Sequence, residues 1–111
     1  MALTTANSGS QACTVTTSHL LDTDTTAGIY VCMWNLTTSV KGDVFRCWAT
    51  TKVLTGDTAE IIFEGGYAND LLDSPIIMSP PIVSMFEINM YINQTAGTSR
   101  TIPWSNIRVA T

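Results

Sequence analysis

A long β-hairpin is predicted by the stretch Asp43-Val-Phe-Arg-Cys-Trp-Ala-Thr-Thr-Lys-Val-Leu54, the tripeptide Thr55-Gly56-Asp57 and the stretch Thr58-Ala-Glu-Ile-Ile-Phe-Glu-Gly-Gly-Tyr67. Alternation with a period of two places one apolar face of each strand on a core. Gly56-Asp57 favours a turn, because glycine accepts positive φ and aspartate can bond its own backbone. The residues expected to face inward are Phe45, Cys47, Ala49 and Val53 on the first arm and Ala59, Ile61, Phe63 and Tyr67 on the second.

The opposite face of this hairpin is also apolar in places, which is unusual for a surface strand. Val44, Trp48 and Ile62 stand there among charged residues such as Arg46 and Glu64. Such a face is either covered by a second layer or contacts a partner. We therefore take Arg46, Trp48 and Ile62 as candidates for a contact surface.

Alternating patterns elsewhere predict further strands, and no window has the spacing of an amphipathic helix. The chain is expected to form an all-β, single-domain antiparallel β-sandwich or jelly-roll-like barrel of about seven to eight strands over 11–111. Residues 1–10 are small and polar, and are expected to form a flexible arm or to order on a neighbouring subunit. The predicted strands are 11–16, continued by 18–21, then 29–36 with both faces apolar and covered, 85–93, and 100–109 with a bulge or edge near 103–106.

The segment between Tyr67 and Met85 lacks regular alternation. Residues 69–75 are compatible with one helical turn, and Pro80-Pro81 prevents regular ladder pairing. Ile76, Ile77 and Met78 are predicted either to form a short edge strand that caps the core or to contact a partner. These three residues are our second group of interface candidates.

Composition narrows the possible functions. The chain has 111 residues, of which only 13% are charged, against about 25% in a typical soluble domain. Such a surface suits a subunit buried in an assembly, although a threonine-rich monomer is an alternative. The net charge of −4 argues against nucleic acid as a partner.

The sequence has few features that indicate a cellular compartment or a role for its cysteines. The N-terminal sequence lacks the features of a signal peptide, and no apolar run approaches the ~20 residues of a membrane span, so we expect synthesis in the cytoplasm. Cys13, Cys32 and Cys47 form no C-x-x-C pair, which argues against zinc. Free thiols are expected, with one disulfide among the three as the alternative.

No catalytic or metal-binding constellation stands out. His19 lies near Asp22 and Asp24, yet no nucleophile motif accompanies them, and the two aspartates match a calcium loop poorly. Glu60 and Glu64 would share a strand face without a cleft. We expect no enzyme activity, no cofactor and no metal.

Several segments resemble a family of small proteins encoded in the structural modules of tailed bacteriophages. The resemblance implies a virion protein on the capsid surface, a capsid decoration (cement) protein that is made in the host cytoplasm, is β-rich and trimeric, and clamps neighbouring major capsid proteins. Polar residues are usual in the family where this chain has Ile29, Met33 and Trp48, which implies a different contact surface. The resembling segments are 4–11, 23–31, 42–43, 51–56, 67–68 and 94–100, followed by Trp104.

Two other hypotheses remain from the sequence. The first is a tail or head-fibre module that binds host glycans, with Trp34, Trp48 or Trp104 stacking on sugars. The second is a structural subunit of a tail or connector. Copy number in the virion separates these classes, because cement proteins are present in hundreds of copies.

Overall fold

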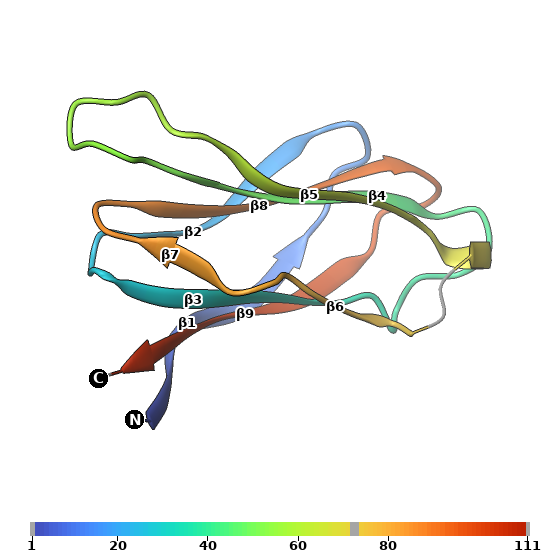
Figure 1. Ribbon diagram of the computed structural model, residues 1–111. Helices are drawn as coiled ribbons and strands as arrows, with labels where there is room; N and C mark the ends of the chain where they lie inside the picture. The colour runs from blue at the N-terminus through green and yellow to red at the C-terminus, as the bar shows by residue number, and fades with distance from the viewer. Residues whose placement is uncertain (1, 72–73, 111) are drawn as a thin grey trace.

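The computed structural model describes residues 2–71 and 74–110, and two antiparallel β-sheets pack face to face in it (Figure 1). The prediction of an all-β sandwich is confirmed. The described residues form nine strands and one 3-10 turn, with one or two strands more than expected. Their bounds are β1 Ala2–Ala12, β2 Ser18–Asp24, β3 Gly28–Asn35, β4 Val44–Thr51, β5 Glu60–Ala68, η1 Asn69–Leu71, β6 Ile76–Met78, β7 Ile82–Ser84, β8 Ile88–Ala96 and β9 Thr101–Ala110.

The first sheet has five strands in the order β1-β9-β3-β6, with β7 also pairing with β3. Tyr30, Cys32 and Trp34 of β3 are completely buried between the sheets. The alternate residues point away from the core, where Ile29 is 37% exposed and Met33 is only partly buried. The expectation that β3 is covered on both sides is therefore wrong, because the described residues form no layer over its outer face.

The second sheet has the order β2-β8-β4-β5 and contains the predicted hairpin. Strand β4 is internal, whereas β5 is an edge strand. The register shifts between Ala49 and Thr50, where Phe63 pairs with Ala49 but Ile61 pairs with Thr50. This bulge breaks the alternation of β5, so Ile61 is 50% exposed and the prediction that it faces inward is wrong.

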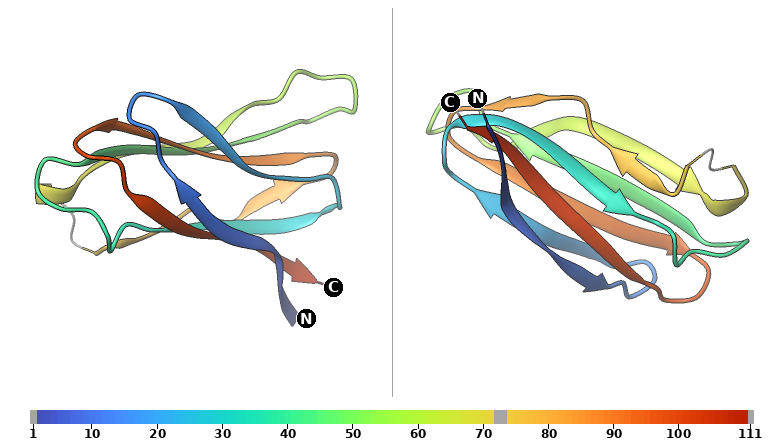
Figure 2. Two further views of the ribbon diagram at one scale, coloured as in Figure 1. Left: turned by 180° about the vertical axis from the view of Figure 1, so that it is seen from behind. Right: turned by 90° about the horizontal axis from the view of Figure 1, so that it is seen from below.

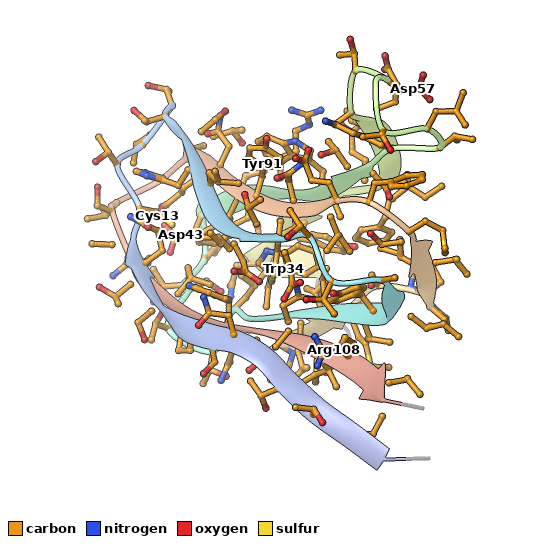
Figure 3. The ribbon with its side chains drawn as sticks, turned by 90° about the vertical axis from the view of Figure 1, so that its left-hand side faces the viewer. Cys13, Trp34, Asp43, Asp57, Tyr91 and Arg108 are labelled. Carbon is orange, nitrogen blue, oxygen red and sulfur yellow. The ribbon has the colours of Figure 1, made fainter. Side chains whose placement is uncertain are left out.

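A single apolar core fills the space between the sheets, and Trp34 lies near its centre (Figure 3). Its indole N–H donates to the backbone oxygen of Tyr91 in the other sheet at 3.1 Å, and its ring stacks on Phe63 with centroids 5.9 Å apart. Both contacts join the two layers. The buried core residues are Cys13, Tyr30, Cys32, Trp34, Leu36, Phe45, Cys47, Ala49, Ile77, Ile82, Ile88, Met90, Ile92 and Ile102.

The N-terminal segment differs most from expectation. Residues 2–10, where we expected a flexible arm, form most of β1, which pairs with β9 from Ala2↔Ala110 to Ala12↔Thr101. Small polar residues suit this position because an antiparallel edge needs backbone groups rather than large side chains. Figure 2 shows β1 and β9 running side by side, so that both ends of the chain emerge together.

The predictions for β2 and β9 also differ from the structure. Strand β2 extends to Asp24, beyond the predicted strand 18–21, so that only residues 25–27 separate it from β3. Strand β9 is continuous and internal, and the register shift lies in its partner β1 between Thr5 and Asn7. The change in apolar phase along β9 arises because its apolar residues move from the inner face at Ile102 to the outer face at Ile107.

All three cysteines are free thiols inside the core. Burial raises the pKa of Cys13 to about 11 and that of Cys32 to about 12, and it also raises the pKa of Cys47. Since the thiolate is the nucleophile, these groups are protected by both burial and protonation.

We predict that the native protein does not react with an aromatic disulfide reagent at pH 8, and that all three thiols react after unfolding in guanidinium chloride. Absorbance of the released thiolate measures both. Rapid labelling of one thiol in the native protein would contradict the burial of that cysteine.

Candidate functional site

The large apolar side chains that remain exposed gather mainly in two regions. We define the sheet face as the outer side of the five-stranded sheet and the hairpin surface as the exposed part of the β4–β5 hairpin. The exposed apolar residues are Leu3, Ile29, Ile76, Met78 and Val83 on the sheet face, Val53, Leu54, Ile61 and Ile62 on the hairpin surface, and Leu20, Val40 and Met85 elsewhere.

The hairpin surface begins with the loop 52–59, which projects beyond the neighbouring strands (Figure 1). The backbone N–H of Asp57 donates to the carbonyl of Leu54 at 3.0 Å, and the N–H of Leu54 donates to the carboxylate of Asp57 at 2.9 Å. These bonds define a tight turn at the predicted position. Val53 is 79% exposed, so its predicted inward orientation is wrong, and its place is next to the turn rather than on the strand.

Trp48 is covered by side chains of its own sheet. Its ring stacks on Tyr91 with centroids 5.1 Å apart and an interplanar angle of 7°, and the Arg46 guanidinium lies 4.3 Å from the ring centroid. Arg46 also forms an ion pair with Glu64. Trp48 is consequently only 7% exposed, although no second layer lies over it, whereas Ile62 at the nearby bulge remains 55% exposed.

The predicted contact segment 76–78 is the short edge strand β6, which pairs with β3. Alternate residues of β6 point to opposite sides of the sheet. Ile77 belongs to the core, while Ile76 and Met78 are 42% and 62% exposed on the sheet face. The helical turn expected within residues 69–75 is the 3-10 turn η1, and residues 72–73 of that prediction lie outside the described residues.

The sheet face extends across the whole sheet, which is four strands wide because β6 and β7 both pair with β3. Ile29 pairs with Val109 on one side and with Val83 on the other, and Val109 pairs in turn with Leu3. Because paired residues point to the same side of a sheet, these four form one apolar row. A second row contains Val31 paired with Ile107.

A shallow hollow of about 230 Å³ interrupts the sheet face at one end. Met33, Ile76 and Pro103 form its apolar wall, and Trp104 contributes an edge. Trp104 is the only one of the three tryptophans that is partly exposed. No sequence signal located this hollow, because its lining comes from three strands that are distant in the chain.

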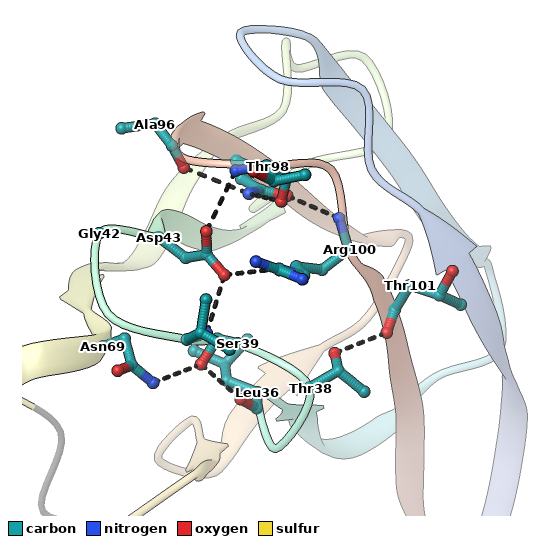
Figure 4. A network of polar contacts seen from close by, with 12 residues as sticks. Leu36, Thr38, Ser39, Gly42, Asp43, Asn69, Ala96, Thr98, Arg100 and Thr101 are labelled. Carbon is teal, nitrogen blue, oxygen red and sulfur yellow. Dashed lines mark hydrogen bonds and ion pairs between the residues drawn. The ribbon is translucent and has the colours of Figure 1, made fainter.

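Asp43 is the most extensively bonded acidic side chain in the described structure (Figure 4). Its carboxylate accepts hydrogen bonds from the backbone N–H of Val40 at 2.9 Å, the backbone N–H of Thr98 at 3.2 Å and Nε of Arg100 at 2.7 Å. Burial opposes ionisation of Asp43, but these donors outweigh it and hold the pKa below its usual range. Since the chain's own donors surround the carboxylate, we assign it a structural role.

The backbone of the turn between β8 and β9 lies close to Asp43. Gly97 has φ +97°, and a Cβ there would collide with the Asp43 carboxylate. The Gln94 side chain holds the same turn by donating to the Thr98 carbonyl at 2.7 Å and accepting from the Arg100 N–H at 3.1 Å. The backbone carbonyl of Asp43 accepts from the N–H of Asn69 at 3.0 Å. Three connections therefore converge on one residue.

The residues considered for acid–base or calcium chemistry have other hydrogen-bond partners. His19 accepts from the backbone N–H of Thr14 at 3.1 Å through Nε2. Asp22 accepts from Asn7 at 3.0 Å and from Asn106 at 2.9 Å. The bonds of Asp22 join β1, β2 and β9 inside the sandwich.

Asp24 lies at the opposite end of the sandwich from Asp43. Its carboxylate accepts from the Thr26 N–H at 2.8 Å and from the Tyr30 hydroxyl at 2.9 Å. Burial opposes its ionisation, but these bonds prevail and lower its pKa, while burial and the Asp24 contact raise the pKa of Tyr30 to about 12. This pair stabilises the short 25–27 connection.

Within residues 2–71 and 74–110, no three His, Cys, Asp or Glu side chains gather as metal ligands. The same part of the chain contains no helix long and apolar enough to cross a membrane. No protein-family model, curated protein or solved structure matches the chain.

We predict that Asp43→Asn lowers the free energy of unfolding by about 2–3 kcal/mol, because Arg100 and two backbone donors lose an ionised acceptor. An aspartate with a lowered folded pKa stabilises above its unfolded pKa near 3.9 and loses this contribution as the pH falls through the folded value. Urea unfolding from pH 7 to pH 2 should therefore show a shallower acid-induced loss in the variant. An unchanged pH profile would refute the role of Asp43, and the residual slope is expected from Asp24.

We predict that Trp48→Ala destabilises the fold by about 3 kcal/mol, as expected for a large aromatic side chain that is almost fully buried. Trp48→Phe should recover part of this loss by stacking on Tyr91. Chemical unfolding followed by circular dichroism measures both variants. A loss below about 0.5 kcal/mol, typical of surface positions, would show that Trp48 is not held by its neighbours in solution.

Proposed function

We propose that this chain is a non-enzymatic structural subunit of a virion, namely a capsid decoration (cement) protein that binds the shell of major capsid protein. The observation that carries the proposal is the pair of separate apolar surfaces on a chain with few charges. A protein that clamps neighbours must contact at least two bodies at once, which requires two surfaces. The resemblance to phage structural proteins favours the capsid as the assembly.

The hairpin surface is the better candidate for the shell contact. It projects from the sandwich, and its turn is held by the two Leu54–Asp57 bonds, so little ordering is needed on binding. A projecting loop of this kind reaches into a joint between neighbouring subunits. Binding at each copy can be weak, because many copies act together over a shell.

The glycan-binding hypothesis has less support. Trp34 is completely buried, and Trp48 is 7% exposed and stacked on Tyr91. Neither presents a free ring face to a sugar, and the partly buried Trp104 packs against the core. The tail or connector hypothesis shares the two apolar surfaces, and the number of copies per virion distinguishes it from a cement protein.

We predict that the protein co-sediments with purified expanded shells of its own phage, and that Ile62→Glu reduces the bound fraction at least tenfold by placing a carboxylate in an apolar contact. Leu20→Glu is the matched control, since Leu20 is 54% exposed against 55% for Ile62 and lies at the opposite edge of the same sheet.

Failure of the wild-type protein to bind such shells would refute the proposed function. Equal losses in the two variants would instead remove the hairpin surface from the contact. Circular dichroism of each variant establishes that the fold is intact before binding is measured.

A further inference from the structure

We propose that the sheet face pairs with the same face of a second copy of this chain, which gives a two-fold symmetric dimer. The inference goes beyond the proposed function, because it concerns the surface on the opposite side of the molecule from the hairpin and does not require a shell.

The chemistry of the sheet face limits what can cover it. Among the described residues, its outward positions hold no charged side chain, although the chain as a whole carries a net charge of −4. The outward side chains of the sheet face are Leu3, Thr5, Ser8 and Ser10 of β1, Thr101, Pro103, Ser105, Ile107 and Val109 of β9, Ile29, Val31, Met33 and Asn35 of β3, Ile76 and Met78 of β6, and Val83 of β7.

The acidic residues that the structure describes lie away from the outward positions of the sheet face. Glu60 and Glu64 are on β5 in the other sheet, and Asp57 is at the tip of the hairpin. Two copies that meet through their sheet faces therefore desolvate no charge at the described outward positions and keep these three carboxylates apart. A strongly charged partner would find no complementary group here, whereas a second copy supplies a matching uncharged face.

The size of the face agrees with a stable dimer. Four strand columns at about 4.8 Å and the eight residues of β3 at about 3.3 Å each outline roughly 500 Å². The accessible area of such a corrugated face is larger than its outline, and it approaches the ~800 Å² per partner of a standard interface.

The relief of the face also suits pairing. Leu3, Val83 and Met78 project from it with exposed fractions of 75%, 66% and 62%, and the 230 Å³ hollow beside Met33 offers room for a side chain from the opposite copy. Side chains of two packed sheets interdigitate in this way inside a sandwich.

A face that contacts itself gives a closed pair, because the same patch is used on both copies. A closed trimer would need two different patches in contact. The geometry therefore points to a dimer rather than the trimer that the family resemblance implies. In this dimer the two hairpin surfaces stay free, so that one particle presents two of them.

Light scattering coupled to size-exclusion chromatography of the full chain tests the proposal. We expect a particle of twice the 12.0 kDa chain mass. Ile107→Glu should weaken association roughly a hundredfold and give monomers, since two unpaired carboxylates would be buried near the centre of the face. Ile62→Glu, on the hairpin surface, should remain dimeric.

A second variant protects the test against misfolding. Val83→Glu lies at the rim, where the native side chain is 66% exposed, so it should fold normally and still weaken the dimer. A monomer at every concentration, a trimer, or a dimer that persists in folded Ile107→Glu would each overturn the proposal. A monomer that binds shells and loses this binding in Ile107→Glu would assign the face to the shell instead.

Discussion

One buried carboxylate holds together the end of the sandwich from which three connections leave. Asp43 accepts from donors on the β3–β4 connection and on the β8–β9 turn, and its carbonyl binds the start of η1. Because both sheets are joined there, the register of β4 against β8 and the approach of β9 to β3 depend on this residue. Position 97 requires glycine, because a larger side chain would collide with that carboxylate.

Period-two alternation was sufficient to predict the fold class and the hairpin. It failed where the surroundings come from distant segments. The sequence around Trp48 does not indicate that Tyr91 will cover it. The sequence around Ile61 likewise does not predict the bulge opposite Thr50. The polar composition of residues 2–10 similarly did not predict a strand, because the strand is held by backbone pairing with β9 rather than by apolar side chains.

The candidate contact residues also divide into those that the local sequence identified and those whose surroundings come from distant segments. Ile62, Ile76 and Met78 were recognisable as apolar residues without an obvious place in the core, whereas Trp48 and Ile77 are satisfied within the fold. The sheet face was missed because β3 and β9 were expected to be covered or interrupted. Its outward residues become one surface only when Ile29, Val83 and Val109 are aligned by strand pairing.

The pairing of β1 with β9 has a consequence for the order of folding events. Strand β1 is synthesised before β9, the only strand it pairs with among the described residues, and the intervening chain takes roughly 5–20 s to make at ordinary rates of synthesis. During that delay its uncharged edge is available to other chains. Contacts between segments that are distant in the chain also slow folding, so β1 is expected to join the sheet only after β9 has been made.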